Sequence, residues 1–169
     1  NLGLFNEEIV PVSIPQRKGD PVIFDTDERP MDTSVEKMAK LRPAFKNDGT
    51  VTAGNASGIN DGAAALLLMS DTKAEELDLK PLVKIRAATS GGVDPAYMGL
   101  GPIPSIRKIL KQENLNISDF SAIELNEAFA AQAIGCIREL NCDREKTNKL
   151  GSGISIGHPI GCSGARILV

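Results

Sequence analysis

The chain has 169 residues, of which 41% are hydrophobic and 24% charged, and its formal net charge is −3. This size and composition are typical of a globular protein with a sizeable core. The acidic balance and an aromatic content of 4% argue against a nucleic-acid-binding protein. No apolar run approaches the roughly 20 residues of a membrane-spanning helix, and no basic-then-apolar leader opens the chain, so no membrane partner is expected.

The first 52 residues are predicted to be irregular. Two short β-prone runs, "VPVSI" and "PVIF", are broken by proline, glycine and charges. Further along, Val35, Met38 and Leu41 recur at helical spacing until Pro43 ends the pattern. We interpret residues 1–52 as an irregular, partly exposed subdomain.

Residues 53–169 alternate between predicted strands and helices. Apolar or β-branched runs predict strands at residues 62–70, 82–90, 120–126 and 152–157. Capping residues and amphipathic spacing predict helices at residues 70–77, 103–115 and 127–140, with a further helix beginning at 163. This alternation predicts an α/β layered fold with a largely parallel core.

Two of these helices carry specific signals. Ser70 or Asp71 is the expected N-cap of the helix over residues 70–77. The helix over residues 103–115 is expected to turn one apolar face inward and its cations outward, a face made by Ile103, Ile106, Ile109 and Leu110.

Three stretches are richer in Gly, Asn, Ser and His than a core element requires: residues 52–63, 124–132 and 151–166. Each lies at a junction between predicted elements. In open α/β sheets, the loops at strand ends are where ligands gather. These stretches are therefore the candidate functional segments.

Asn126 is predicted to end a strand, with Glu127 in the first turn of the next helix. A helix cap with an acidic residue favoured by the helix dipole explains this pair. An amide that projects into a cleft and donates to an oxyanion explains it equally well.

His158 is the only histidine, and it lies between Gly157 and Pro159 in a predicted turn. A lone histidine is more often structural, but one held by rigid turn residues is well placed as a general base near neutral pH. Its nearest thiol in sequence is Cys162. Cys136 is expected in the apolar face of a helix and Cys142 in an exposed charged loop.

The three cysteines have no metal-ligand spacing, which indicates reduced thiols and a cytoplasmic protein. With one histidine and no CxxC pair, no metal site is expected. The sequence begins with Asn1 and stops inside a predicted helix, "SGARILV". We therefore expect a piece of a longer protein.

Several motifs together resemble the thiolase family, and closely its acetyl-CoA acetyltransferase type. They are "KLRPAF", "GTVTAGNASGINDGAAALLLMS", "GVDPAYMGLGPIP", "NEAFAAQA" and "GHPIGCSGARI", in the family's order and at near-family spacings. The resemblance implies a thiolase-like βαβαβαββ layered half over residues 53–169, truncated before its last strands. Residues 1–52 would then be part of the family's irregular loop domain.

The resemblance also implies a reaction, the reversible Claisen condensation of two acetyl-CoA to acetoacetyl-CoA plus CoA through an acyl-cysteine. His158 matches the family's base for that cysteine. Asn126 matches the asparagine that holds a water, which with the histidine forms an oxyanion hole. Coenzyme A thioesters would be substrates, so no cofactor is expected.

By the same resemblance, five residues match positions along the substrate. Ser57 matches a position in the pantetheine tunnel, and Met98 matches an apolar wall beside a short acyl group. Leu41, Phe45 and Ala53 match positions near the CoA in the loop domain. Arg29 lies near the family's basic residue for the CoA phosphates, at a different local spacing.

The sequence also departs from the family pattern. The family's nucleophilic cysteine and its CxGGG cysteine have no match here, and "KLGSGISIGHP" varies the usual "NGGAIAIGHP". The expected protein is a homo-oligomeric enzyme of fatty-acid metabolism when full length, with this piece inactive alone. The alternatives are a truncated CoA-binding or interaction module without catalysis, and a hydrolase-like use of Cys162 with His158.

Overall fold

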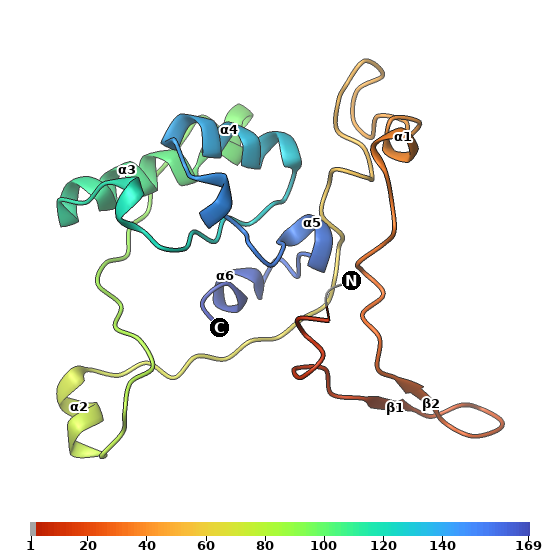
Figure 1. Cartoon of the computed structure of the whole chain (residues 1–169), viewed down its shortest axis with the longest axis horizontal. Coiled ribbons are helices and arrows are strands. Elements are labelled where there is room, and N and C mark those ends of the chain that lie inside the picture. The colour runs from red at the N-terminus through yellow and green to blue at the C-terminus, as the bar shows by residue number, and fades with distance from the viewer. Residues whose placement is uncertain (1–2) are drawn as a thin grey trace.

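The computed structural model describes residues 3–169 of the chain. Figure 1 shows a helical region around α3 and α4, the short helices α5 and α6, and an extended arm that carries α1 and a small hairpin. The α-helices and strands in chain order are β1 (Val12–Ile14), β2 (Val22–Phe24), α1 (Val35–Met38), α2 (Asp71–Glu76), α3 (Pro102–Glu113), α4 (Ala130–Leu140), α5 (Gly153–Ile156) and α6 (Ser163–Arg166). Three 3-10 turns complete the list: η1 (Pro95–Leu100), η2 (Ile117–Asp119) and η3 (Arg144–Lys146).

The two β-prone runs near the start form the predicted strands. β1 pairs with β2 in antiparallel register, with Val12 opposite Phe24 and Ile14 opposite Val22. Both strands are exposed along their length. This hairpin is the one sheet among residues 3–169.

The helix start predicted at Ser70 is confirmed by its cap, and the helical spacing that begins at Val35 is preceded by a cap of the same kind at Ser34. The Ser34 hydroxyl accepts from the Lys37 N–H and begins α1, and the Ser70 hydroxyl accepts from the Lys73 N–H and begins α2. The α1 helix ends at Met38, and Leu41 lies in the turn that follows it.

The strands predicted at residues 62–70 and 82–90 are wrong for the described chain. Both segments run without a strand partner among residues 3–169, on either side of α2 (Figure 1). Leu67 is 85% exposed and Leu82 is 100% exposed. A β-prone run becomes a strand only when a neighbour supplies the hydrogen-bond ladder and covers its side chains.

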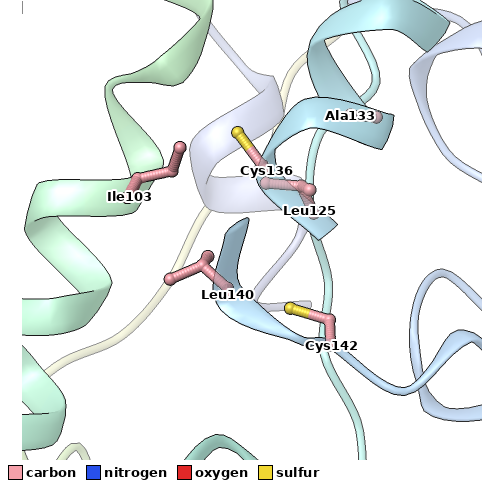
Figure 2. Close-up of a cluster of buried hydrophobic side chains, with 6 residues drawn as sticks. All are labelled: Ile103, Leu125, Ala133, Cys136, Leu140 and Cys142. Carbon is pink, nitrogen blue, oxygen red and sulfur yellow. The ribbon is translucent and has the colours of Figure 1, made fainter. Parts of the chain in front are cut away.

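The core lies between α3 and α4, where Ile103 of α3 is buried as its spacing predicts. Figure 2 shows its side chain pointing toward Leu140 and Cys136 of α4, with Leu125 nearby. The core residues are Ile103, Leu125, Ala133, Cys136, Leu140 and Cys142.

The expected place of Cys136 is confirmed, whereas the exposed place expected for Cys142 is wrong, because Cys142 is only 8% exposed. The left-handed C-cap Asn141 reverses the chain, and the Cys142 N–H then donates to the Ile137 carbonyl at 2.9 Å. The thiol is thereby placed in the core. Burial raises the pKa of both thiols.

The helix predicted from Glu127 begins three residues later, at Ala130. Phe129 is extended because this stretch pairs with the segment before residue 58. The Ser57 N–H donates to the Ala128 carbonyl, and the Ala130 N–H donates to the Asn55 carbonyl, each at 2.9 Å. The Ala128 carbonyl accepts from Ser57 and so does not accept a helical N–H, whereas the Ala130 N–H belongs to the first turn of α4, where it needs a partner outside the helix.

The last two predicted strands are also corrected. Residues 120–126 contribute a single parallel bridge, between Ile123 and Thr147. Residues 153–156 form one turn of helix, because the Ile156 N–H donates to the Ser152 carbonyl and the Ser155 hydroxyl accepts from the Ser152 N–H. Among residues 3–169, no helix is both long and apolar enough to cross a membrane.

Candidate active site

Asn126 and His158, which are 32 residues apart in sequence, meet in the structure. The Asn126 side-chain nitrogen lies 3.3 Å from His158 Nε2 and 3.5 Å from Nδ1. Because these two distances are nearly equal, the amide nitrogen lies opposite the part of the imidazole ring between Nδ1 and Nε2. It therefore does not point along the lone pair of either ring nitrogen. The Asn126 Oδ1 is buried and has no hydrogen-bond partner among residues 3–169.

The histidine loop is held through its backbone. The His158 N–H lies 3.3 Å from the Gly58 carbonyl and 3.2 Å from Asn60 Oδ1, and both oxygens accept. Gly157 has a φ of +89°, a conformation that favours glycine, and its carbonyl accepts from the Arg166 guanidinium at 2.7 Å. The ring therefore projects from a fixed turn.

The position of Asn126 is fixed by hydrogen bonds to the backbone of the residues on either side of it, Leu125 and Glu127. The Asn148 side chain accepts from the Leu125 N–H at 2.7 Å and donates to the Leu125 carbonyl at 2.8 Å. The buried Ser152 hydroxyl accepts from the Glu127 N–H at 3.2 Å and donates to the Leu125 carbonyl at 3.1 Å. Asn126 thus lies between two clamped residues.

The three polar-rich stretches converge, as expected of a site. Residues 55–59 run between the other two, forming an antiparallel bridge from Ala56 to Phe129 and a parallel bridge from Ile59 to His158. Ser57 lies between these bridges, half-buried. One short segment therefore sets the spacing between the asparagine loop and the histidine loop.

The other predicted substrate residues differ in their exposure and in what they contact. The ring of Phe45 meets Phe129 edge-on at a centroid distance of 5.9 Å, although Phe45 is 74% exposed. Leu41 reaches Gly54, next to the exposed Ala53. Met98 lies in η1 and is 78% exposed.

Phe45 and Ser57 are thus connected to the backbone that follows Asn126. No backbone hydrogen bond or isolated bridge joins Met98 to His158 among residues 3–169. Arg29 packs against the segment of residues 55–59. Its guanidinium contacts Gly58 and donates to the Ala56 carbonyl at 3.4 Å. The Arg29 Nε is buried, and no described residue is its hydrogen-bond partner.

None of the three thiols is hydrogen-bonded to His158 in residues 3–169. Cys136 donates to the Gly99 carbonyl, and Cys142 lies in the same core. Cys162 is buried at the start of α6, beside Gly62. The imidazole is instead bonded through Nδ1 to the Ser163 hydroxyl, at 2.7 Å.

Four residues of this arrangement were not identified from the sequence: Asn60, Asn148, Ser152 and Ser163. Their partners are between 5 and 98 residues away, and short polar side chains carry no periodic signal. Among the described residues, no three His, Cys, Asp or Glu side chains gather as a metal site would require.

Comparison with known families identifies the fold around this pair. The family model described as "Thiolase, N-terminal domain" matches residues 1–72, and "Thiolase, C-terminal domain" matches residues 79–169. The chain belongs to the thiolase family. The predicted division between residues 52 and 53 stays a prediction.

Two bacterial proteins are among the curated relatives of this thiolase chain. It is 59% identical over 169 residues to an acetyl-CoA acetyltransferase of Syntrophomonas wolfei, covering 99% of this chain and 42% of that protein. It is 56% identical to a probable acetyl-CoA acyltransferase of Staphylococcus aureus (strain MRSA252), covering 99% of this chain and 43% of that protein. The chain thus spans under half the length of these relatives.

A solved thiolase confirms the fold class. The crystal structure of the Bacillus anthracis acetyl-CoA acetyltransferase superposes with a TM-score of 0.89 at 52% identity, covering 98% of this chain and 42% of that one. The thiolase-like α/β assignment therefore holds, although residues 3–169 themselves contain a single two-stranded sheet.

Proposed function

We propose that this chain is part of an acetyl-CoA acetyltransferase that catalyses the reversible Claisen condensation of two acetyl-CoA to acetoacetyl-CoA plus CoA. The observation that carries the proposal is the meeting of Asn126 and His158, 3.3 Å apart, on two loops that a third segment holds together. Membership of the thiolase family and the names of the bacterial relatives support the same reaction class.

The chemistry needs two things that this pair can supply. Removal of a proton from the α-carbon of a thioester creates an enolate oxygen, which has to be stabilised by hydrogen-bond donors. The Asn126 amide, directly or through a water, and an imidazole N–H are such donors. The same imidazole, when neutral, can accept the proton of a cysteine thiol and so activate it as a nucleophile.

In this proposal, the nucleophilic thiol lies outside residues 1–169. Two of the three thiols here are core residues with raised pKa values, and the third is buried beside Gly62. A thiolate is the reactive form, and the raised pKa values of Cys136 and Cys142 disfavour it, whereas the Nδ1 of His158 is bonded to Ser163 and not to Cys162. We therefore propose that the chain alone does not turn over acetoacetyl-CoA.

The substrate residues proposed are Ser57, Met98, Ala53, Phe45 and Leu41, which would contact the pantetheine and acyl parts of the thioester. Met98, as a bulky apolar side chain beside the acyl group, favours short chains. The family resemblance also supports a cytoplasmic homo-oligomer as the working form of the full-length enzyme.

Two assays test the proposal. The purified chain is incubated with acetoacetyl-CoA and CoA, and acetyl-CoA is measured by chromatography; no turnover is expected. In a chimera, residues 1–169 replace the matching region of the Bacillus anthracis enzyme, and turnover is expected because that enzyme would supply the thiol.

Two outcomes would contradict the proposal. One is turnover by the isolated chain, which would mean that a thiol of its own acts with His158. The other is a folded, oligomeric chimera that binds CoA in a calorimetric titration without turnover, which would favour a binding module without catalysis.

A further inference from the structure

We propose that Ser163 is a positioning residue that fixes His158 in its Nδ1–H tautomer and leaves the lone pair of Nε2 free as the base. The inference rests on the proposed function for its role in catalysis, but not for the tautomer itself. Its starting point is the shortest side-chain contact of His158, the 2.7 Å separation between Nδ1 and the Ser163 hydroxyl oxygen.

The proton count at Ser163 decides the direction of that bond. The same hydroxyl lies 3.0 Å from the Pro159 carbonyl oxygen, and a carbonyl oxygen can only accept. A serine has one hydroxyl hydrogen. If that hydrogen is given to Pro159, the hydroxyl oxygen can meet Nδ1 only as an acceptor, and Nδ1 must carry the hydrogen.

The opposite hydrogen-bond direction, from the Ser163 hydroxyl to Nδ1, would leave the hydroxyl oxygen without a donor. Were Ser163 to donate to Nδ1, its oxygen would keep its lone pairs without a donor while only 3% of the residue is exposed. Buried polar groups strongly favour arrangements in which donors and acceptors are all paired. The Pro159 carbonyl, which also accepts from the backbone N–H groups of Cys162 and Ser163 at 2.8 Å each, is held in place by the first turn of α6.

The place of Asn126 agrees with this assignment. Its amide nitrogen is almost equally far from the two ring nitrogens, so it does not occupy the in-plane lone-pair direction of Nε2. With Nδ1 committed to Ser163, Nε2 is the nitrogen left for an incoming group. The outer partner of a histidine commonly sets its tautomer in this way.

One tautomer then serves both tasks of the proposed reaction. The thiol proton passes to Nε2, which gives a thiolate and an imidazolium, and the bond from Nδ1 to Ser163 is unchanged. The new Nε2–H is then a donor that an enolate or thioester oxygen can use. The opposite tautomer would offer a hydrogen to the thiol and could not accept one.

Nitrogen-15 NMR of this chain tests the assignment, because His158 is its only histidine and gives a single pair of ring signals. At a pH of about 8.5, where an ordinary imidazole is neutral, the two-bond proton–nitrogen correlations are expected to show a protonated Nδ1 and an unprotonated Nε2. A spectrum dominated by the Nε2–H form overturns the proposal.

Variants separate the role of the hydroxyl from a general effect on the fold. Ser163→Ala is expected to shift the tautomer ratio toward Nε2–H by about 5- to 10-fold, the equilibrium equivalent of one hydrogen bond, and Ser163→Thr to restore it. Ser155→Ala, which removes a hydroxyl bonded only to Ser152, is expected to leave the ratio unchanged.

An unchanged ratio in Ser163→Ala also overturns the proposal. Because the readout is spectroscopic, its outcome is separate from that of the chimera assay. A folded, CoA-binding chimera without turnover, together with a protonated Nδ1, would reject the acyltransferase function and leave the tautomer assignment standing.

Discussion

The side-chain amide of Asn148 pairs with both backbone groups of Leu125, accepting from the N–H at 2.7 Å and donating to the carbonyl at 2.8 Å. The amide thereby supplies the two hydrogen bonds that a residue of a neighbouring strand would give to Leu125. The backbone around Leu125 otherwise pairs through the bridge between Ile123 and Thr147. Since Leu125 precedes Asn126, this pairing fixes where the asparagine leaves the core.

We expect Asn148→Ala to destabilise the chain by about 1–3 kcal/mol, because a buried N–H and carbonyl would lose their partners. The measurement is the free energy of unfolding in urea. Asn148 has a φ of +50°, so part of the loss would come from backbone strain.

Asn141→Ala is the matched control for that strain, because Asn141 has a φ of +53° and its side chain makes no hydrogen bond in the described structure. An equal loss of stability in both variants would mean that the pairing with Leu125 contributes nothing.

A second prediction concerns stability at alkaline pH. Burial raises the pKa of the Cys136 and Cys142 thiols above their ordinary value of 9.0. The unfolded chain therefore loses these protons first, so stability is fully present below about pH 9 and falls as the pH rises further. The urea midpoint is expected to drop as the pH rises above about 9.

The Cys136→Ala, Cys142→Ala double variant should show a flatter pH dependence over the same interval, at a lower overall stability. A drop as steep as that of the parent chain would assign the effect to other groups.

The third prediction addresses the two proposed catalytic residues. In the chimera, Asn126→Ala is expected to lower kcat by about 10²–10³, the usual cost of one oxyanion-hole donor. His158→Ala is expected to lower it by about 10²–10⁴, the range for a general base. Acetoacetyl-CoA thiolysis is the assay, and Gln112→Ala on the exposed side of α3 is the control. Activity within threefold of the parent in either variant would remove that residue from the mechanism.

A fourth prediction separates binding from chemistry at Phe45. Because Phe45 is largely exposed and touches Phe129 by its edge, Phe45→Ala should cost less than about 1 kcal/mol of stability. If Phe45 contacts the CoA as proposed, the chimera variant has a higher KM with kcat unchanged. A changed kcat at constant KM would place the ring outside the binding surface.

What the sequence predicted well was local. Ser70 begins its helix as expected, and Ile103 is buried where its spacing placed it. The three polar stretches were identified from composition and strand-end logic, and they do converge on Asn126 and His158. Helix caps, helical spacing and polar-rich motifs are all properties of continuous stretches of sequence, which is why they can be predicted from it.

What the sequence could not predict was set by distant partners. Cys142 is buried because a left-handed turn at Asn141 redirects the chain, and Glu127 lies outside α4 because the neighbouring backbone pairs with residues 55–57. The contact from Asn60 to His158 spans 98 residues. Strand propensity at residues 62–70 and 82–90 likewise does not reveal which segment, if any, lies alongside.

Those two extended segments have a practical consequence for the purified chain. Each presents open backbone donors and acceptors next to exposed leucines, such as Leu67 and Leu82. Such edges invite pairing between molecules and are accessible to proteases. Limited digestion of this chain should therefore cut on either side of α2 before it reaches α3 or α4.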